Sequence, residues 1–505
     1  MAPKIATVAE PNDPYEVDVL QGEIELSPLE IPVRSDKLIV RKIDRWLMPL
    51  MALTYMLQFL DKQTLSQTSI MGFIEDLDLT GNQFSWAGSI FYFGYLAFTY
   101  PAALLLVRFS IAKYLTVVMF LWTVILACHA AVTSFAGIMA LRFLLGAAEA
   151  SISPGFTLLT GMWYTREEQP LRYGLWFAGS SAASAFGGLI CFGIAHIHAS
   201  IETWKLLYII YGAITLLWTA VIYQFLPDEP DNARFLTRDE RARVVERIRE
   251  NQTGVKENVI RGYQVWEALT DYKVWLLVLY QLSSNIPNGA MLVFSVLVTK
   301  GFGFTELETY LIQIPIGAAH ALFALGSTWL AGRFTNSRCI LAGITTLISL
   351  LGCLLIYKLE GKVVPLIGIL LYMASVAGMP LSFSLISANT GGFTKRATVS
   401  AMILIAYCAG NLIGPFLFFE REAPRYKSGY LSIIICFCVA VASIGALAVA
   451  LRNENRRRDR LAVVSSDRND NDNENASTKQ DIVVESTGEI PDLTDKENLG
   501  FRYVY

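Results

Sequence analysis

Long apolar runs recur throughout this chain of 505 residues and constrain its fold more than any other feature. A helix of about 20 apolar residues crosses the hydrocarbon core of a bilayer at about 1.5 Å per residue, with all its backbone polar groups paired internally. Only 17% of the residues are charged, against roughly 25% in soluble domains. The sequence therefore predicts an all-α polytopic membrane protein with twelve transmembrane helices, near 45–65, 83–107, 113–133, 135–163, 171–196, 204–226, 272–299, 307–331, 338–357, 364–388, 395–419 and 429–451.

The predicted spans form two groups of six, separated by a hydrophilic stretch. This layout divides the chain into a cytosolic N-terminal segment 1–43, a six-helix half 44–226, a cytosolic loop 227–270, a second six-helix half 271–452 and a disordered cytosolic tail 453–505. A short internal match supports two related halves, because Arg108-Phe109-Ser110 with Lys113 and Arg333-Phe334-Thr335 with Arg338 follow the second helix of each half at the same spacing. Transporters built from such repeats bind substrate between the halves, near the midplane.

Lys and Arg are concentrated in alternate loops, which predicts that both termini face the cytosol. Within the central loop, Thr237 and Glu240 have the spacing of a helix-capping box. The stretch from there to about Glu250 has an apolar stripe at helical spacing, so we expect an amphipathic cytosolic helix.

Four charged residues interrupt the apolar runs. Arg142 and Glu149 lie seven residues apart in the fourth span, which places them on one face of a helix, about 10 Å apart along its axis. Asp61 and Lys62 lie together in the first span. Charges at membrane depth normally face a bundle interior or aqueous cavity and mark the path of a substrate or proton.

The chemistry of these residues suits coupled transport. Burial at membrane depth favours the protonated form of the Glu149 carboxyl, whereas Arg142 opposes this effect and can bind an anion by a two-pronged contact. The arrival of a proton or a substrate can then exchange the pairing between acid and base. A static buried ion pair that only orients two helices is the alternative interpretation.

Four asparagines also lie in apolar spans: Asn285, Asn288, Asn389 and Asn411. Unpaired amides in hydrocarbon are costly, so each is expected to face a neighbouring helix or the transport cavity. Hydrogen bonding between helices is favoured for Asn285 and Asn389, and both roles stay open for Asn288 and Asn411. The stretch Ile286-Pro287-Asn288-Gly289 is expected to break its helix near the middle of the membrane.

Several short motifs accompany these charges: Leu60-Asp61-Lys62, the stretch 142–155, Trp163-Tyr164 with Arg172, Pro230–Leu236, Ile286–Gly289, Lys300–Phe304, Gly392–Arg396 and Tyr407–Pro415. In combination they resemble the fungal allantoate permease family, in the anion:cation symporter branch of the major facilitator superfamily. The likeness covers about residues 40–452. It implies a monomeric importer in the plasma membrane, which carries a small organic anion or amide (an allantoate-like ureide, a vitamin-like carboxylate or a short peptide) with protons by alternating access.

The resemblance also implies roles for particular residues. Asp61 and Glu149 match the proton-coupling carboxylates, Lys62 and Arg142 match contacts to the substrate anion, and Asn288 and Asn411 would shape the pocket. Gating residues are expected in the loops after the second helix of each half, at Arg108, Lys113, Arg333 and Arg338. The superfamily signature in the first of these loops is eroded, since Ala103, Val107 and Ser110 occupy its Gly, Asp and Gly places. Arg108 therefore lacks a nearby carboxylate and is equally well interpreted as a membrane-interface anchor.

Other functional classes find less support in the sequence. A proton antiporter that exports a fungal secondary metabolite is the main alternative, but the fifth span lacks the Gly-Pro step of that group. A nutrient sensor without transport would normally have a longer signalling extension. We find no nucleophile–base pair, metal-ligand spacing or nucleotide-binding loop, and the net charge of −3 comes without a basic patch for nucleic acid. We therefore expect no enzyme, metal or cofactor, and a proton gradient as the energy source.

Overall fold

The structure is a computed structural model, which describes residues 33–165, 168–197, 200–251, 261–334, 336–469, 493–498 and 500–505. These residues form α-helices and short 3-10 helices, and no strand occurs among them. The helices are α1 (Val33–Thr68), α2 (Phe73–Asp76), α3 (Gln83–Arg108), α4 (Ile111–Cys128), η1 (His129–Ala131), α5 (Phe135–Glu149), α6 (Ile152–Trp163), α7 (Gln169–Phe177), α8 (Gly179–Ile194), α9 (Thr203–Phe225), η2 (Pro230–Asn232), α10 (Arg238–Asn251), α11 (Gly262–Thr270), α12 (Tyr272–Gly301), α13 (Glu306–Arg333), α14 (Arg338–Lys358), α15 (Val363–Tyr372), η3 (Met373–Ala377), α16 (Gly378–Asn389), α17 (Phe393–Ile413), η4 (Gly414–Leu417), η5 (Glu420–Glu422) and α18 (Lys427–Asn469).

Within the described residues, eleven helical segments are long and apolar enough to cross a membrane, and they coincide with the second to twelfth predicted spans. Some consist of two helices in sequence, such as α5 with α6 over Phe135–Trp163. The first predicted span differs. It lies in α1, which begins at Val33, inside the segment predicted to precede the first half, and which runs for 36 residues. Because α1 contains polar residues, among them the buried Gln58, Asp61 and Lys62, it is not one of the eleven segments that are apolar enough to cross a membrane.

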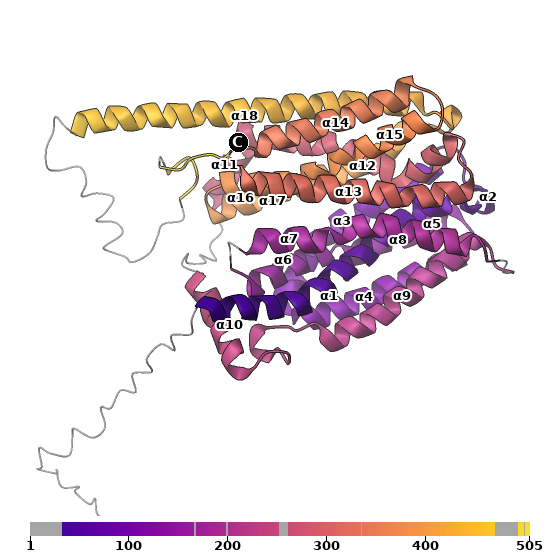
Figure 1. Ribbon diagram of the computed structural model, residues 1–505, viewed down its shortest axis with the longest axis horizontal. Coiled ribbons are helices and arrows are strands. Elements are labelled where there is room, and N and C mark those ends of the chain that lie inside the picture. Colours follow the sequence, from indigo (N-terminus) through magenta and orange to yellow (C-terminus); the bar gives the residue numbers. More distant parts are fainter. Residues whose placement is uncertain are drawn as a thin grey trace, which may run out of the picture.

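Figure 1 shows two bundles of helices, one built from α1 to α9 and the other from α12 to α18. We call them the first and second bundle. At one end of the molecule lie α10, α11 and the C-terminal residues; we call this end the terminal face, and the opposite end, near α2, the far face (Figure 1). Hydrogen bonds join the bundles toward the far face, where Ser85 Oγ donates to Pro415 O over 2.9 Å and Ser89 Oγ to Leu412 O over 2.8 Å.

The crossing of α3 and α5 positions the central charges. Gly94 on α3 and Gly146 on α5 lie so close to the opposite backbone that a Cβ on either would collide with the carbonyl of Phe143 or Phe91, respectively. Removing the side chain at both positions lets the helix axes approach, as small residues do in membrane bundles. This contact fixes the register of α5, and with it Arg142 and Glu149, against α3.

The predicted break in the seventh span is wrong. Pro287 lies inside α12, which continues as one helix through residues 286–289. The glycine in this motif has a packing role instead, because a Cβ on Gly289 would lie 2.5 Å from the Cα of Asn411 on α17. The Pro-Asn-Gly sequence therefore brings two helices together without ending either.

The central loop between the two bundles contains the expected amphipathic helix. Glu240 N donates to Thr237 Oγ1 over 3.3 Å and Thr237 N to a Glu240 carboxylate oxygen over 2.8 Å, so the capping box forms. Val244 is fully buried, and Lys42 on α1 pairs with Glu240 at 2.7 Å. The helix α10 thus packs against the terminal face of the first bundle.

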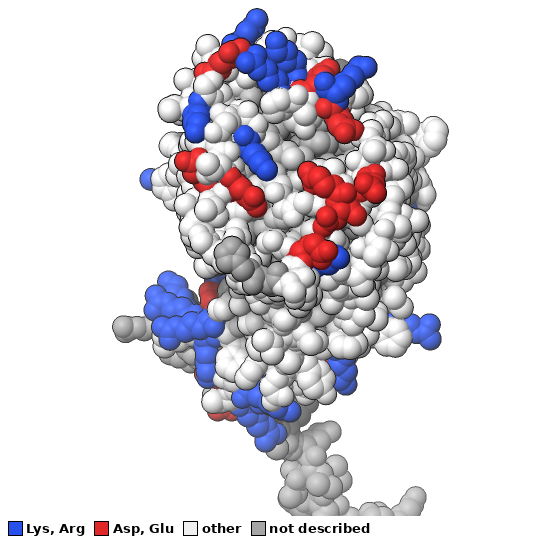
Figure 2. Space-filling model, turned by 90° about the vertical axis from the view of Figure 1, so that its right-hand side faces the viewer, with Lys and Arg blue, Asp and Glu red and all other residues white. Residues whose placement is uncertain are grey.

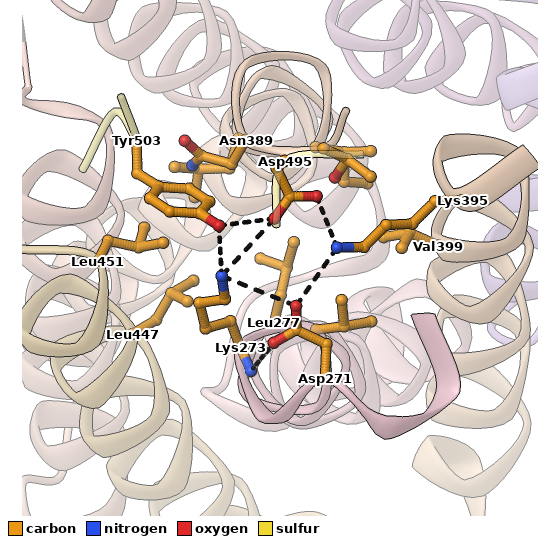
Figure 3. A pocket seen from close by; sticks show the side chains of 14 residues that line it. Asp271, Lys273, Leu277, Asn389, Lys395, Val399, Leu447, Leu451, Asp495 and Tyr503 are labelled. Atoms are coloured by element: carbon orange, nitrogen blue, oxygen red, sulfur yellow. Dashed lines mark hydrogen bonds and ion pairs between the residues drawn. The ribbon is translucent and has the colours of Figure 1, made fainter. Parts of the chain in front are cut away.

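The segment predicted as a disordered tail is partly ordered. The last helix, α18, runs on to Asn469, and residues 493–498 and 500–505 pack against the second bundle. Asp495 lies between Lys273 and Lys395, and Tyr503 lies against Lys273 (Figure 3). Charge contributes to this docking, because Asp495 adds an acid to the two buried lysines, which also contact Asp271 and, for Lys395, Glu267. Residues 470–492 of the predicted tail and residues 1–32 of the predicted N-terminal segment lie outside the described residues.

Candidate functional site

The four intramembrane charges are all buried in the first bundle. Their exposed fractions are 1% for Asp61, 9% for Lys62, 3% for Arg142 and 0% for Glu149. Asp61 and Lys62 come from α1, and Arg142 and Glu149 from α5. Burial of this degree is rare for charged side chains unless they are paired or functional.

The structure pairs charges across these two helices. Lys62 Nζ lies 3.6 Å from a carboxylate oxygen of Glu149. Among the described residues, neither carboxylate oxygen of Glu149 has a hydrogen-bond partner. The carboxylate is therefore held by the attraction of Lys62 and not by a fixed set of donors. An ion pair of this kind can be exchanged for another partner without breaking a hydrogen-bond network.

Aromatic rings surround the Lys62 ammonium group. Its Nζ lies 5.5 Å from the ring centroid of Phe91 and 5.4 Å from that of Tyr95, both on α3. Cation–π contacts of this kind are worth about 0.5–2 kcal/mol. They give the cation a partial substitute for its carboxylate, so Lys62 has support when Glu149 is neutral. The sequence reasoning missed these rings, although the aromatic run at residues 91–95 was visible.

Arg142 makes contacts of a different kind. Its Nε donates to Ala87 O over 3.2 Å, and its guanidinium carbon lies 5.7 Å from the Phe91 centroid. Its Nη1 is buried and has no hydrogen-bond partner among the described residues. Contacts with α3 therefore orient the guanidinium group of Arg142, and its Nη1 is left as a hydrogen-bond donor without a partner among the described residues.

Asp61 does not join the Lys62–Glu149 pair, although it is adjacent to Lys62 in sequence. Consecutive residues on a helix point about 100° apart. Lys62 faces Glu149, whereas Asp61 faces the indole of Trp122 on α4, and its Oδ2 has no hydrogen-bond partner among the described residues. The structure therefore separates the two predicted coupling carboxylates into different surroundings.

The asparagines of the second bundle form a cluster. Asn288 on α12 donates to Asn411 Oδ1 on α17 over 2.8 Å, and Asn411 donates in turn to Tyr407 O over 2.8 Å. Asn285 Oδ1 lies 3.4 Å from Asn411 Nδ2. The predicted pair Asn288 and Asn411 is therefore brought together, in the arrangement expected of a bond between helices.

Two tyrosines connect this cluster to the charged site. The ring of Tyr407 on α17 lies 6.0 Å from the ring of Tyr92 on α3, centroid to centroid. Tyr92 follows Phe91, which contacts both Lys62 and Arg142. The phenol oxygen of Tyr92 is buried without a hydrogen-bond partner among the described residues. The charged pair and the asparagines thus lie on opposite sides of the contact between the bundles.

The remaining predicted residues lie away from this centre. Asn389 binds Val504 through both backbone groups, at 2.7 Å each, and so fastens the C-terminal segment. Arg108, Lys113 and Arg333 are exposed on the terminal face, and Arg338 donates to Ser384 O over 2.9 Å within the second bundle. The carboxylate missing from the loop after the second helix is supplied from elsewhere, since Asp228 accepts from Ser110 Oγ at 2.6 Å and from Ala112 N at 2.7 Å.

Two bundles of helices long and apolar enough to cross a membrane, with buried charges inside the first, indicate a multi-pass membrane transporter. Comparison with known proteins identifies the family: a sequence model described as Major Facilitator Superfamily matches residues 51–415. The chain belongs to this superfamily.

Named relatives agree with this assignment. An uncharacterised transporter of Schizosaccharomyces pombe is 39% identical over 94% of this chain and 90% of its own. The allantoate permease of Saccharomyces cerevisiae is 35% identical over 86% of this chain and 84% of its own, which confirms the resemblance predicted from the motifs. A thiamine pathway transporter of Saccharomyces cerevisiae is 34% identical over 82% and 78%. The relatives are transporters and permeases, not enzymes.

The fold also matches solved structures. A bacterial homologue of the human lysosomal transporter Spinster, in an inward-facing and unoccupied conformation, superposes with a TM-score of 0.62. The alignment covers 80% of this chain and 96% of that one, at 14% sequence identity. At this identity the likeness concerns the fold alone.

Proposed function

We propose that this transporter is a proton-coupled symporter that imports a small organic anion or amide by alternating access. The observation that carries the proposal is the Lys62–Glu149 pair, which is buried in the first bundle and has no hydrogen bond to either carboxylate oxygen among the described residues. Asp61 and Glu149 are the proposed proton carriers. Lys62 and Arg142 are the proposed anion contacts.

The coupling follows from charge balance in a low-dielectric site. Lys62 with ionised Glu149 is neutral, and so is Lys62 with a bound anion beside protonated Glu149. Either change alone leaves an unpaired buried charge, which costs several kcal/mol. Protonation of Glu149 and binding of the anion therefore favour each other, and this linkage is reciprocal. Arg142, with its free Nη1, offers the anion a second, forked contact.

The substrate class rests on the second bundle and on the relatives. Asn288 on α12 is only partly buried and is held by its hydrogen bond to Asn411 on α17, and an amide side chain there suits a ligand with amide or carboxylate groups. The named relatives include an allantoate permease and a thiamine pathway transporter. We accordingly place the substrate among allantoate-like ureides, vitamin-like carboxylates and short peptides. The protein needs no cofactor and acts as a monomer.

The same reasoning orients the protein in its membrane. Arg108, Lys113 and Arg333 are exposed on the terminal face, and cytoplasmic loops are the ones enriched in Lys and Arg. We place the terminal face, with both chain ends, in the cytosol and the far face outside the plasma membrane. Arg108, Lys113, Arg333 and Arg338 then border the cytosolic gate, while the hydrogen bonds near the far face close the outer gate.

Substrate-evoked proton movement tests this function. The purified protein is reconstituted in proteoliposomes that contain a pH-sensitive dye, and a panel of ureides, carboxylates and dipeptides is added outside. We expect one class to acidify the lumen and to accumulate when the outside is made acidic. Substrate accumulation that raises luminal pH would instead identify a proton antiporter, the class that exports metabolites.

A further inference from the structure

One histidine lies at the contact between the two bundles. His320 is on α13 of the second bundle, and its Nδ1 lies 2.6 Å from the hydroxyl oxygen of Ser181 on α8 of the first bundle. The two side chains are 8% and 4% exposed, respectively. The half-buried ring of Phe59 on α1 also packs on the imidazole, with ring centroids 6.1 Å apart. His320 therefore contacts two helices of the opposite bundle.

Small residues let α8 and α13 approach each other closely at this point. A Cβ on Gly317 of α13 would lie 2.8 Å from Ser181 O, and a Cβ on Gly188 of α8 would collide with Tyr310 O of α13. Such positions bring helix backbones together in membrane bundles. Within the part of the chain that the structure describes, the Ser181 hydroxyl makes no other hydrogen bond. The helix crossing therefore holds one nitrogen of the His320 ring against Ser181.

The other ring nitrogen, Nε2, is available to a ligand. It has no hydrogen-bond partner among the described residues and is not fully enclosed, whereas Nε2 of His129 is. The lipid-facing side of α13 carries Leu322 and Trp329, which are 70% and 68% exposed. His320 precedes Leu322 by two positions, or about 200° around the helix, so its side chain points away from lipid. The open nitrogen therefore faces the contact between the bundles.

His320 lies at the depth of the buried ion pair in the first bundle. It is fourteen residues after the start of α13, and Glu149 is fourteen residues after the start of α5, which is about 21 Å from the far-face end of each helix. Phe59, which packs on the imidazole, precedes Lys62 on α1 by three residues, close to one helical turn. A molecule that contacts Lys62 therefore lies about one turn of α1 away from His320.

The far face itself is a poor surface for holding an anion. Acidic side chains stand on it (Figure 2), and both Glu75 on α2 and Asp78 after it are exposed. Charges of the same sign repel a carboxylate at such a surface. The groups that hold an anionic substrate are therefore expected deeper, at the level of Lys62 and His320.

We propose that His320 is a specificity-determining residue, whose Nε2 binds a second polar group of the substrate while Lys62 and Arg142 hold its carboxylate. The inference rests on the proposed transport function and deepens it. Because His320 belongs to the second bundle and Lys62 to the first, one substrate molecule contacts both bundles. The preferred substrate is then a carboxylate that also carries a carbonyl or N–H group, as a ureide or a dipeptide does.

The hydroxyl of Ser181 sets which of these groups Nε2 binds. If the hydroxyl donates to Nδ1 of His320, Nε2 carries the ring hydrogen and donates to a carbonyl oxygen of the substrate. If the hydroxyl accepts from Nδ1, Nε2 accepts from an N–H group. A ureide or an amide offers both groups, whereas a plain carboxylate leaves Nε2 without a partner.

Chemical labelling of the wild-type protein tests the geometry without a substitution. Diethyl pyrocarbonate, a small reagent that modifies imidazole nitrogens, is added to proteoliposomes, and mass spectrometry measures the modification of each histidine. His196 is exposed and should react fastest, whereas His129 is 0% exposed. We expect His320 to react at least about tenfold faster than His129, whose buried nitrogen reacts only when the bundle opens locally. Equal rates for His320 and His129 would overturn the inference.

Two substitutions separate the roles of the two ring nitrogens. In His320→Asn the side-chain amide reaches the position of Nδ1 and nothing replaces Nε2, whereas in His320→Gln the amide reaches the position of Nε2. The probe is whichever radiolabelled ureide, carboxylate or dipeptide the wild-type protein exchanges fastest across the proteoliposome membrane. We expect the half-saturation concentration to rise about tenfold in His320→Asn, the size of one hydrogen bond to the substrate, at a nearly unchanged maximal rate. His320→Gln should restore the half-saturation concentration to within about threefold of wild type.

His196→Asn is the matched control, because it makes the same change at an exposed histidine, and it is expected to exchange substrate as the wild type does. An unchanged half-saturation concentration in His320→Asn, or an equal rise in His320→Asn and His320→Gln, contradicts the substrate contact and leaves the proposed function intact. Exchange needs no net proton movement, so a wild-type protein that exchanges substrate without moving protons disproves the symport and leaves the role of His320 standing. Exchange of none of the probes overturns both.

Discussion

The docked C-terminal segment gives a prediction whose size follows from its contacts. Asp495 is 1% exposed and contacts Lys395 through Oδ1 and Lys273 through Oδ2, and its Oδ2 also accepts from Tyr503 at 2.6 Å (Figure 3). The perturbation is Asp495→Asn, which keeps the volume of the side chain and removes its charge. The segment then docks on two lysines without its own compensating acid.

The expected loss of docking free energy depends on which acids still contact the two lysines after the substitution. Removing one partner of a buried ion pair costs about 3–5 kcal/mol when the other is left alone. Lys395 keeps Glu267 at 2.8 Å and Asp271 at 3.4 Å, so the loss is smaller here. We estimate about 2–3 kcal/mol, the size of one or two hydrogen bonds to a charged group. Because 1.36 kcal/mol is tenfold, docking weakens roughly 30- to 150-fold.

Hydrogen exchange of the last residues measures this effect. The Tyr503 and Val504 amides donate to Asn455 Oδ1 at 2.9 Å and Asn389 Oδ1 at 2.7 Å, so they exchange only when the segment undocks. Their exchange is expected to accelerate by the same factor in Asp495→Asn. The control is Asp459→Asn, an exposed partner of Arg502, for which a change below about fivefold is expected. Equal exchange in Asp495→Asn and wild type would refute the reasoning.

The pH dependence of this docking has a definite sign. Burial alone would raise the pKa of Asp495, but Lys395, together with Tyr503 and Lys273, outweighs burial and lowers that pKa below its ordinary value of 3.8. A carboxyl whose pKa is lower in the docked state contributes stability above 3.8 and loses it as the pH falls through the docked pKa. Exchange of the segment should therefore not respond to this group near neutral pH and should accelerate only below about pH 4.

Further predictions concern packing and the asparagine cluster. Gly146→Ala forces a Cβ into the backbone of α3, so the yield of folded protein after detergent extraction should drop sharply. Gly161→Ala, with nothing within 4 Å of the added Cβ, should behave as wild type. Size-exclusion chromatography measures both yields, and equal yields would contradict the packing argument. Asn411→Ala removes the partner of Asn288 and leaves it unpaired, at a cost of about 1–3 kcal/mol. Substrate affinity or the melting temperature of the purified protein should therefore fall, and wild-type values of both would argue against a role for the cluster.

The apolar runs sufficed to locate the second to twelfth spans, because the bilayer imposes a length and an apolar composition on any helix that crosses it. They located the first helix less well. The start of α1 at Val33 depends on polar contacts with α10, such as Lys42–Glu240, that apolar content does not indicate.

The sequence did not predict which of the four buried charges form an ion pair. Helical spacing put Arg142 and Glu149 on one face and Asp61 beside Lys62, but the ion pair that forms joins Lys62 to Glu149. Which residues meet depends on how α1 and α5 are rotated against α3, and close backbone contacts such as Gly146 with Phe91 set this rotation. A single sequence does not reveal which glycines make such contacts.

The docked segment was missed for a related reason. Its polar composition is typical of disordered chain, and the sequence around Lys395 gives no sign of a distant acidic partner. In the structure Lys395 is 1% exposed, and the acid that balances it, Asp495, lies 100 residues later in the chain. Long-range charge compensation of this kind leaves no local pattern.

The central claim is that the Lys62–Glu149 pair exchanges partners to couple proton and substrate. Its most direct measurement is proton-driven substrate accumulation by Glu149→Gln in proteoliposomes, alongside substrate exchange at equal pH on both sides. The account predicts that accumulation is lost while measurable exchange persists, because glutamine binds no proton and leaves Lys62 available to the anion. Accumulation by Glu149→Gln at the wild-type level would contradict the claim and reduce the pair to a structural contact between α1 and α5.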